Sequence, residues 1–331
     1  MTKPGSTTRP RRMWSALALL AGATLALSAC SSSGKPATRT VVITQSNGQT
    51  TTVTSGAPST SPAPSKTAHL GKPVHVKLKF SDGSTFGVGI PVIAYFSRTP
   101  TSGTAFQQAT KATVNDTPVK GAWYFETSSA EKGYPVEAHF RMQTYWPAHA
   151  TVHVDLPVKG LSAGRGLSFD DSLTSDFSTG AANISTVDDS THMITVTTDG
   201  KPFGAFPVSL GAVSTPTARG TKVIMEKGKS ICMSGPGYNE CGVKYTQRLT
   251  YGGEYLHAAP WNTGNIGRLD SSNGCTNMLT PDALKLYNFL GIGDVVMYPN
   301  ANGPKMQLGA GYGDWNVPWS QWLNGGLAHT R

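Results

Sequence analysis

Short segments of residues 69–182 alternate apolar and polar side chains, and this pattern limits the chain to a β-rich fold more strictly than any other. Successive side chains of a strand point to opposite faces of a sheet, so a period of two indicates strands with one buried face. Gly, Asp, Ser and Pro separate the segments and are typical of turns. An antiparallel β-sandwich is therefore expected here. The clearest segments are Val74–Phe80, Val136–Phe140 and Ala150–Leu156.

The composition also favours strands and turns over long surface helices. Charged residues make up 14% of the chain, well below the ~25% that is usual for globular proteins. The 331 residues leave room for two or three domains of ~100–200 residues. A second β-rich region follows over residues 183–299, so a mainly β protein with two β domains is predicted.

One helix is predicted in the second region, from Thr280 to Leu290. Thr280 is the expected N-cap, Pro281 suits the first helical position, and Gly291 suits the C-terminal stop. Residues 300–331 are expected to pack on the domains as an extension, because they carry three large apolar rings. These are Trp315, Trp319 and Trp322.

Residues 1–29 have the pattern of a secretory signal. Four basic residues precede an apolar run, Trp14–Leu27, which is too short to span ~30 Å of hydrocarbon comfortably. The next residues, Leu27-Ser28-Ala29-Cys30, resemble the bacterial lipobox, in which the Cys becomes the lipidated N-terminus. The resemblance implies a lipid anchor at Cys30 on the extracytoplasmic face of the cell membrane. Ordinary signal-peptide cleavage and an uncleaved anchor are the alternatives.

Residues 30–68 predict a flexible tether, because they are rich in Ser, Thr, Pro and Gly and have few large apolar side chains. A small hairpin is compatible with Asn47-Gly48 between two short β-like segments.

The net charge of +9 argues weakly for a nucleic-acid partner. Four of the positive charges lie in the signal, and subtracting them from +9 leaves +5. No basic run or basic-aromatic stripe follows, so no nucleic acid is expected. His75, His139 and His153 lie at alternating strand positions without Cys or clustered carboxylates nearby in the sequence. They predict exposed strand histidines rather than a metal site.

His257 and Cys275 are the strongest candidates for chemistry. A Cys is a good nucleophile as its thiolate, and a neighbouring imidazole can take the thiol proton and return one to a leaving amine. Gly274 would let a substrate approach the backbone closely. The alternatives are a buried structural Cys and a structural His.

The residues around this pair resemble the signature of the L,D-transpeptidases. The matching segments are His257-Ala258-Ala259-Pro260-Trp261 and Ser272-Asn273-Gly274-Cys275-Thr276-Asn277. Two positions differ, because Asn273 replaces a His and Thr276 replaces a hydrophobic residue of the family pattern. The resemblance implies an immunoglobulin-like β-sandwich at 69–182, an L,D-transpeptidase catalytic β-sandwich at 183–299, and a Trp-rich C-terminal extension.

The resemblance also implies the roles of individual residues. Cys275 would be the nucleophile and His257 the acid and base, oriented by the backbone carbonyl of Ala258. Backbone N–H groups of Gly274 and Cys275 would form the oxyanion hole. Further residues are expected to contact the substrate or shape its pocket. These are Tyr238, Gly252 and Gly253 on the strand before His257, Trp261, Asn273 and Asn277.

Cys232 and Cys241 lie nine residues apart in the loop expected to cover the site. In an exported protein we expect them to form a disulfide that stiffens this lid. A metal site at these two cysteines is the weaker alternative, because neither thiol has a neighbouring His in the sequence.

The resulting hypothesis is a peptidoglycan enzyme that joins tetrapeptide stems by 3→3 cross-links through a Cys thioester, with release of D-Ala. No cofactor is expected, and carbapenems should acylate Cys275. The alternatives are an L,D-carboxypeptidase and a non-catalytic peptidoglycan-binding lipoprotein.

Overall fold

The computed structural model describes residues 40–44, 50–54, 71–128, 130–235 and 238–330. They belong to two compact units, residues 1–65 and 66–331. In the first unit, β1 (Thr40–Thr44) and β2 (Thr50–Thr54) pair antiparallel, which confirms the expected hairpin. Cys30 and most of the predicted tether lie outside the described residues. No helix in the described ranges is long and apolar enough to cross a membrane.

The immunoglobulin-like domain has two main sheets. One has the order β4 (Val76–Leu78), β6 (Val92–Phe96), β10 (Val136–Arg141), β9 (Ala122–Thr127); the other has β5 (Ser84–Phe86), β13 (Leu173–Thr179), β11 (Thr151–Leu156), β7 (Lys111–Val114), β8 (Thr117–Val119). Their pairs are antiparallel except β5 with β13. A short parallel pair, β3 (Lys72–Val74) with β12 (Leu167–Phe169), and helix α1 (Thr104–Ala109) complete the domain.

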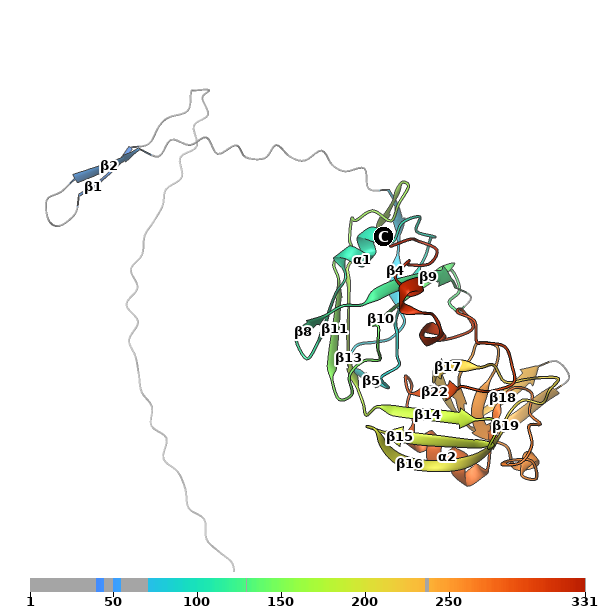
Figure 1. The fold of residues 1–331 in the computed structure, drawn as a ribbon. Helices are drawn as coiled ribbons and strands as arrows, with labels where there is room; N and C mark the ends of the chain where they lie inside the picture. The colour runs from blue at the N-terminus through green and yellow to red at the C-terminus, as the bar shows by residue number, and fades with distance from the viewer. Residues whose placement is uncertain (1–39, 45–49, 55–70, 129, 236–237, 331) are drawn as a thin grey trace, which may run out of the picture. The chain divides into compact units, whose positions relative to one another are not determined.

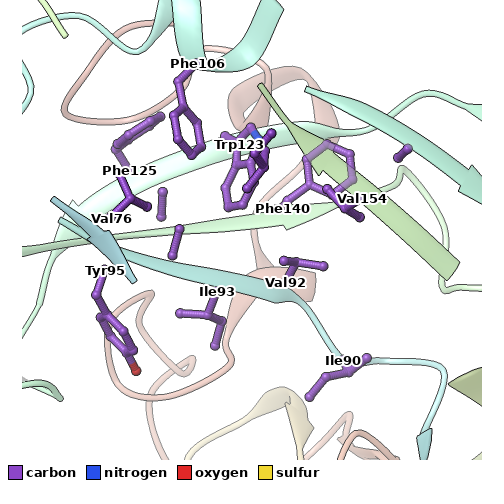
Figure 2. Packing of buried hydrophobic residues seen from close by; sticks show 14 of the residues in the cluster. Val76, Ile90, Val92, Ile93, Tyr95, Phe106, Trp123, Phe125, Phe140 and Val154 are labelled. Atoms are coloured by element: carbon purple, nitrogen blue, oxygen red, sulfur yellow. The ribbon is translucent and has the colours of Figure 1, made fainter. Parts of the chain in front are cut away.

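Side chains from both sheets form one hydrophobic core. The predicted alternation is visible in β11, where Val152, Val154 and Leu156 are buried and the intervening residues are not. Figure 2 shows the aromatic centre of this core, with Phe106 close to Trp123. Their ring centroids lie 5.0 Å apart in an edge-to-face arrangement, which aromatic pairs prefer.

The second domain is built on nine strands in one hydrogen-bonded order. The order is β17 (Gly220–Val223), β22 (Val295–Tyr298), β14 (Asn183–Asp188), β15 (Met193–Thr198), β16 (Lys201–Ser209), β21 (Thr276–Met278), β20 (Tyr255–Ala258), β19 (Tyr238–Arg248), β18 (Glu226–Gly235). Only Ile224 and Met225 join the first strand of this order to the last. Two residues span roughly 7 Å, so the sheet curls on itself and encloses a second core.

Helix α2 (Thr280–Phe289) lies where a helix was predicted, but its N-terminus differs in detail. Leu279 is the N-cap, so the prediction of Thr280 as the cap is wrong. At the other end the ammonium of Lys227 donates to the carbonyl of Tyr287 at 2.6 Å. Cations at a helix C-terminus satisfy the last carbonyls.

The C-terminal segment contains the short helices η2 (Asp314–Asn316) and α3 (Trp319–Trp322) and contacts both domains. Trp322 is fully buried, stacks on Tyr124, and donates its indole N–H to the Ala122 carbonyl at 2.8 Å. Figure 1 shows this segment in red beside β9. On the other domain, the side chain of Asn316 accepts from the N–H of Thr221 at 2.8 Å. The segment therefore joins the two domains.

The expectation of exposed strand histidines is wrong for His139. His75 is exposed, but His139 is only 1% exposed and lies 2.7 Å from the carboxylate of Asp314. These residues are 175 positions apart, so the contact could not be seen in the local sequence.

Candidate active site

Two neighbouring parallel strands bring the predicted chemical pair together. His257 lies in β20 opposite Asn277 of β21, and Cys275 immediately precedes β21. Both side chains line one cavity of about 270 Å³. The other residues around it are Met233, Glu240, Val243, Trp261, Asn262, Ser271, Ser272, Asn273 and Asn277.

His257 is held as a neutral, oriented imidazole. Its Nδ1 lies 2.9 Å from the carbonyl oxygen of Ala258, which can only accept, so Nδ1 carries the proton and Nε2 has a free lone pair. Burial lowers the pKa of His257 more than the Ala258 carbonyl raises it. The indole of Trp261 stacks on the ring with centroids 5.9 Å apart. His257 is therefore arranged to accept a proton.

Cys275 is a neutral thiol in the resting protein. It is 6% exposed, and burial raises its pKa to about 11, with a further increase from the Glu254 carboxylate. The Tyr255 backbone and the Lys222 ammonium act in the opposite direction. The thiol donates to the Gly253 carbonyl at 3.5 Å. Attack by Cys275 consequently requires removal of its proton at the time of reaction.

The loop before Cys275 is held by hydroxyl groups. The hydroxyl of Ser272 donates to the Cys275 carbonyl at 2.6 Å and accepts from the Gly274 N–H at 3.1 Å. Thr217 donates to the Gly274 carbonyl at 3.0 Å. Gly274 has a φ of +100°, a conformation that other residues rarely adopt. Since its N–H already has Ser272 as a partner, an oxyanion would have to share or displace this bond.

Gly252 and Gly253 lie in a turn, not on the strand where they were placed from the sequence. β20 begins only at Tyr255, and the Gly253 N–H donates to the Thr250 carbonyl at 3.2 Å across the turn. Gly253 has a φ of +98°, which ends the extended conformation. The turn directs the Gly253 carbonyl toward the Cys275 thiol.

An ion pair beside Cys275 was missed from the sequence. Lys222 is fully buried, pairs with Glu254, and places its ammonium 3.9 Å from the ring centre of Tyr298. The Tyr298 hydroxyl is 2.7 Å from that of Thr276. The polar Thr276 at a position that is hydrophobic in the family pattern therefore has a buried hydroxyl partner.

The hairpin of β18 and β19 forms one wall of the cavity. Cys232 and Cys241 are joined by a disulfide across it, with Cα atoms 3.9 Å apart, which confirms the predicted pairing. Met233, Glu240 and Val243 of this hairpin line the cavity. Sequence reasoning missed them, although they flank the two cysteines. Residues 236–237 and the side chain of Tyr238 lie outside the description, so the role of Tyr238 stays a prediction.

Comparison with known proteins agrees with this geometry. Residues 182–297 match the family of L,D-transpeptidase catalytic domains, and residues 28–162 match a bacterial Ig domain. The chain is 31% identical to L,D-transpeptidase 2 of Mycobacterium tuberculosis, over 78% of this chain and 64% of that protein. It is 30% identical to the probable L,D-transpeptidase 3 of the same species, over 65% of this chain and 82% of that one.

A solved structure of the L,D-transpeptidase LdtMt1 in complex with imipenem is similar in fold. It shares 26% identity with a TM-score of 0.55, and the alignment covers 67% of this chain and 97% of that one. Because the chain spans 64% of the length of L,D-transpeptidase 2, the likeness to that relative concerns part of the relative only.

Proposed function

The chain belongs to the L,D-transpeptidase family, and we propose from this premise that it is a cysteine acyltransferase that forms 3→3 cross-links in peptidoglycan. One observation carries the proposal. A buried thiol, Cys275, and an imidazole with a free Nε2, His257, line the same cavity from neighbouring strands. This is the arrangement that acyl transfer through a thioester requires.

In the acylation step, the sulfur of Cys275 attacks the carbonyl between diaminopimelate and the terminal D-Ala of a donor tetrapeptide. Nε2 of His257 takes the thiol proton as the carbon–sulfur bond forms, and the resulting imidazolium protonates the leaving nitrogen of D-Ala. The amide C–N bond breaks, and a thioester remains. The Ala258 carbonyl would stabilise the imidazolium through the Nδ1 hydrogen bond.

In the second step, the side-chain amine of an acceptor diaminopimelate attacks the thioester. His257 again accepts a proton and returns it to the sulfur, so the thiol is regenerated and a new amide is formed. If water attacks instead, the product is a shortened stem, and the enzyme acts as an L,D-carboxypeptidase. Trp261, which stacks on His257, and the buried Asn277 both line the cavity, and we propose that they contact the stem held there.

The remaining assignments follow the same family pattern. Gly252, Gly253 and Asn273 are proposed to contact the stem, and Tyr238 to cover it from the hairpin. The Cys275 N–H is proposed as an oxyanion donor, with Gly274 joining it if its bond to Ser272 opens. Lipidation of Cys30 would hold the enzyme at the extracytoplasmic face of the membrane, with residues 30–68 as the tether to its substrate.

The test is incubation of the full chain in detergent with a disaccharide-tetrapeptide, followed by mass spectrometry of free D-Ala and cross-linked dimer. The expected result is both products from the wild type and neither from Cys275→Ala. D-Ala without dimer would identify a carboxypeptidase. Equal results for both proteins would leave only the non-catalytic, peptidoglycan-binding alternative.

Inhibitor binding gives a second test, because a relative has been solved in complex with imipenem. We propose that imipenem acylates Cys275, which would add one imipenem mass to the wild-type chain. The Cys275→Ala chain should stay at its own mass.

A further inference from the structure

A second group of titratable side chains lies outside the cavity, in the immunoglobulin-like domain where the C-terminal segment packs. Glu126 comes from β9, Glu137 and His139 come from neighbouring β10, and Asp314 comes from η2. All four residues are buried. One potential ligand atom from each of Glu126, Glu137 and His139 lies within 4.8 Å of the others. No part of the proposed cross-linking reaction uses them.

The imidazole of His139 is aimed at the two glutamates. Its Nδ1 is 2.7 Å from the Asp314 carboxylate, which fixes the proton on that nitrogen. Its Nε2 lies 3.6 Å from Glu137 and 3.9 Å from Glu126. These distances are too long for hydrogen bonds, and Nε2 has no hydrogen-bond partner among the residues described. The buried Nε2 is therefore within ion-pair distance of both carboxylates but makes no hydrogen bond, which leaves its bonding capacity unfilled.

The spacing fits a shared ion. Two donors bound at ~2.0–2.1 Å to a tetrahedral zinc are roughly 3.4 Å apart, close to the separations seen from Nε2. The hydrogen bond that the remote nitrogen, Nδ1, donates to Asp314 is the outer-shell contact that metal-binding histidines usually have. The second oxygen of Glu137 accepts from Ser128 at 2.8 Å, which holds that carboxylate in position.

Three buried carboxylates surround His139, namely Glu126, Glu137 and Asp314. The cations that act on them are His139 itself when its ring is protonated, the Arg141 guanidinium and the Lys79 ammonium. Because a bound metal ion releases the proton from its histidine ligand, a divalent ion would replace the imidazolium charge among these carboxylates. Glu126 also lines an open cavity of about 610 Å³ beside Gly309, which provides a path from solvent.

We propose that Glu126, Glu137 and the Nε2 of His139 bind one divalent transition-metal ion, for which zinc is the best match. One imidazole and two carboxylates suit zinc, and a water could complete the coordination. Because Asp314 belongs to the C-terminal segment and the three ligands to the immunoglobulin-like domain, the bound ion would fasten the segment to that domain. Glu137 and His139 are two residues apart on one strand, but Glu126 comes from the neighbouring strand β9, and the short sequence pattern alone did not indicate a metal site.

The experiment uses the full chain in detergent, stripped with a chelator and loaded with Co²⁺ as a spectroscopic substitute for zinc. We expect about one retained equivalent after gel filtration, with visible absorption bands that added Zn²⁺ abolishes. His139→Gln and Glu126→Gln should each lose the bands. The matched control is His192→Gln, because His192 belongs to the other His–carboxylate cluster, with Asp189 and Asp270, and is only partly buried.

Each outcome either supports or contradicts the metal site. Bands that survive in Glu126→Gln, or that vanish in His192→Gln alone, would assign the cobalt elsewhere and overturn the proposal. Absence of bands from the wild-type chain would do the same. If His139→Gln fails to fold, as judged by near-UV circular dichroism of its tryptophans, Glu126→Gln decides the question.

Discussion

The reactivity of Cys275 toward iodoacetamide should be far below that of an ordinary thiol at neutral pH. A free cysteine with a pKa of ~8.5 is roughly 10% thiolate at pH 7.5. Burial raises the pKa of Cys275 to about 11, which leaves roughly 0.03% thiolate at the same pH. Since the thiolate is the nucleophile, alkylation should be slower than that of a cysteine in a short unstructured peptide by a factor on the order of 300.

The assay follows alkylation of the Cys275 peptide by mass spectrometry from pH 6.5 to 10, with a short unstructured cysteine-containing peptide in the same tube. The rate should rise about tenfold per pH unit across this range, because ionisation is still incomplete at its upper end. His257→Gln should keep this slope, since burial and not an imidazolium sets the pKa. A rate that is flat between pH 6.5 and 8 and becomes steep in His257→Gln would instead reveal a thiolate–imidazolium pair and refute the reasoning.

Four further measurements test other parts of the structure. Burial holds the pKa of His257 below its ordinary value of 6.5. The rate of imipenem acylation should therefore increase with pH only below about 6.5 and stay level to pH 8. An acylation rate that is still rising above pH 7 would contradict this. Reduction of Cys232–Cys241 should lower the free energy of unfolding by ~2–3 kcal/mol. It should also raise KM for the donor, because the hairpin lines the cavity. An unchanged urea midpoint would contradict the predicted loss of stability. Trp322→Ala should cost ~3–5 kcal/mol in urea denaturation while acylation by the folded protein stays within about twofold, since Trp322 packs on β9. Thr276→Val should lower the free energy of unfolding by ~1–3 kcal/mol, because it leaves the Tyr298 hydroxyl unpaired. Adding Tyr298→Phe should recover part of this loss. A double variant that loses more stability than the two single variants together would be inconsistent with this pairing.

Several parts of the site could be predicted from neighbours along the chain. The alternation in Ala150–Leu156 predicted a half-buried strand, and β11 has that burial pattern. The segment around His257 and Cys275 identified the family, which the similarity to known L,D-transpeptidases confirms. Cys232 and Cys241 were close enough in the sequence for their disulfide to be expected. Each of these inferences depends on residues within a short stretch.

The local errors have equally specific causes. Gly252 and Gly253 were placed on the strand before His257 by the family resemblance, but the positive φ of Gly253 makes a turn. The N-cap moved from Thr280 to Leu279 because the backbone of Leu279 is already in the capping conformation. A pattern of residue types does not specify these individual backbone angles.

By itself, the sequence determined the strand-rich architecture and the family, and it singled out His257 and Cys275 as candidates, because periodicity and motifs are carried by adjacent residues. Only the tertiary structure decided their protonation states, the Lys222–Glu254 pair beside Cys275, and the environment of His139. Burial and charge depend on every group that surrounds a side chain in space. For His139 the decisive carboxylate lies 175 positions away, where no local pattern could reveal it.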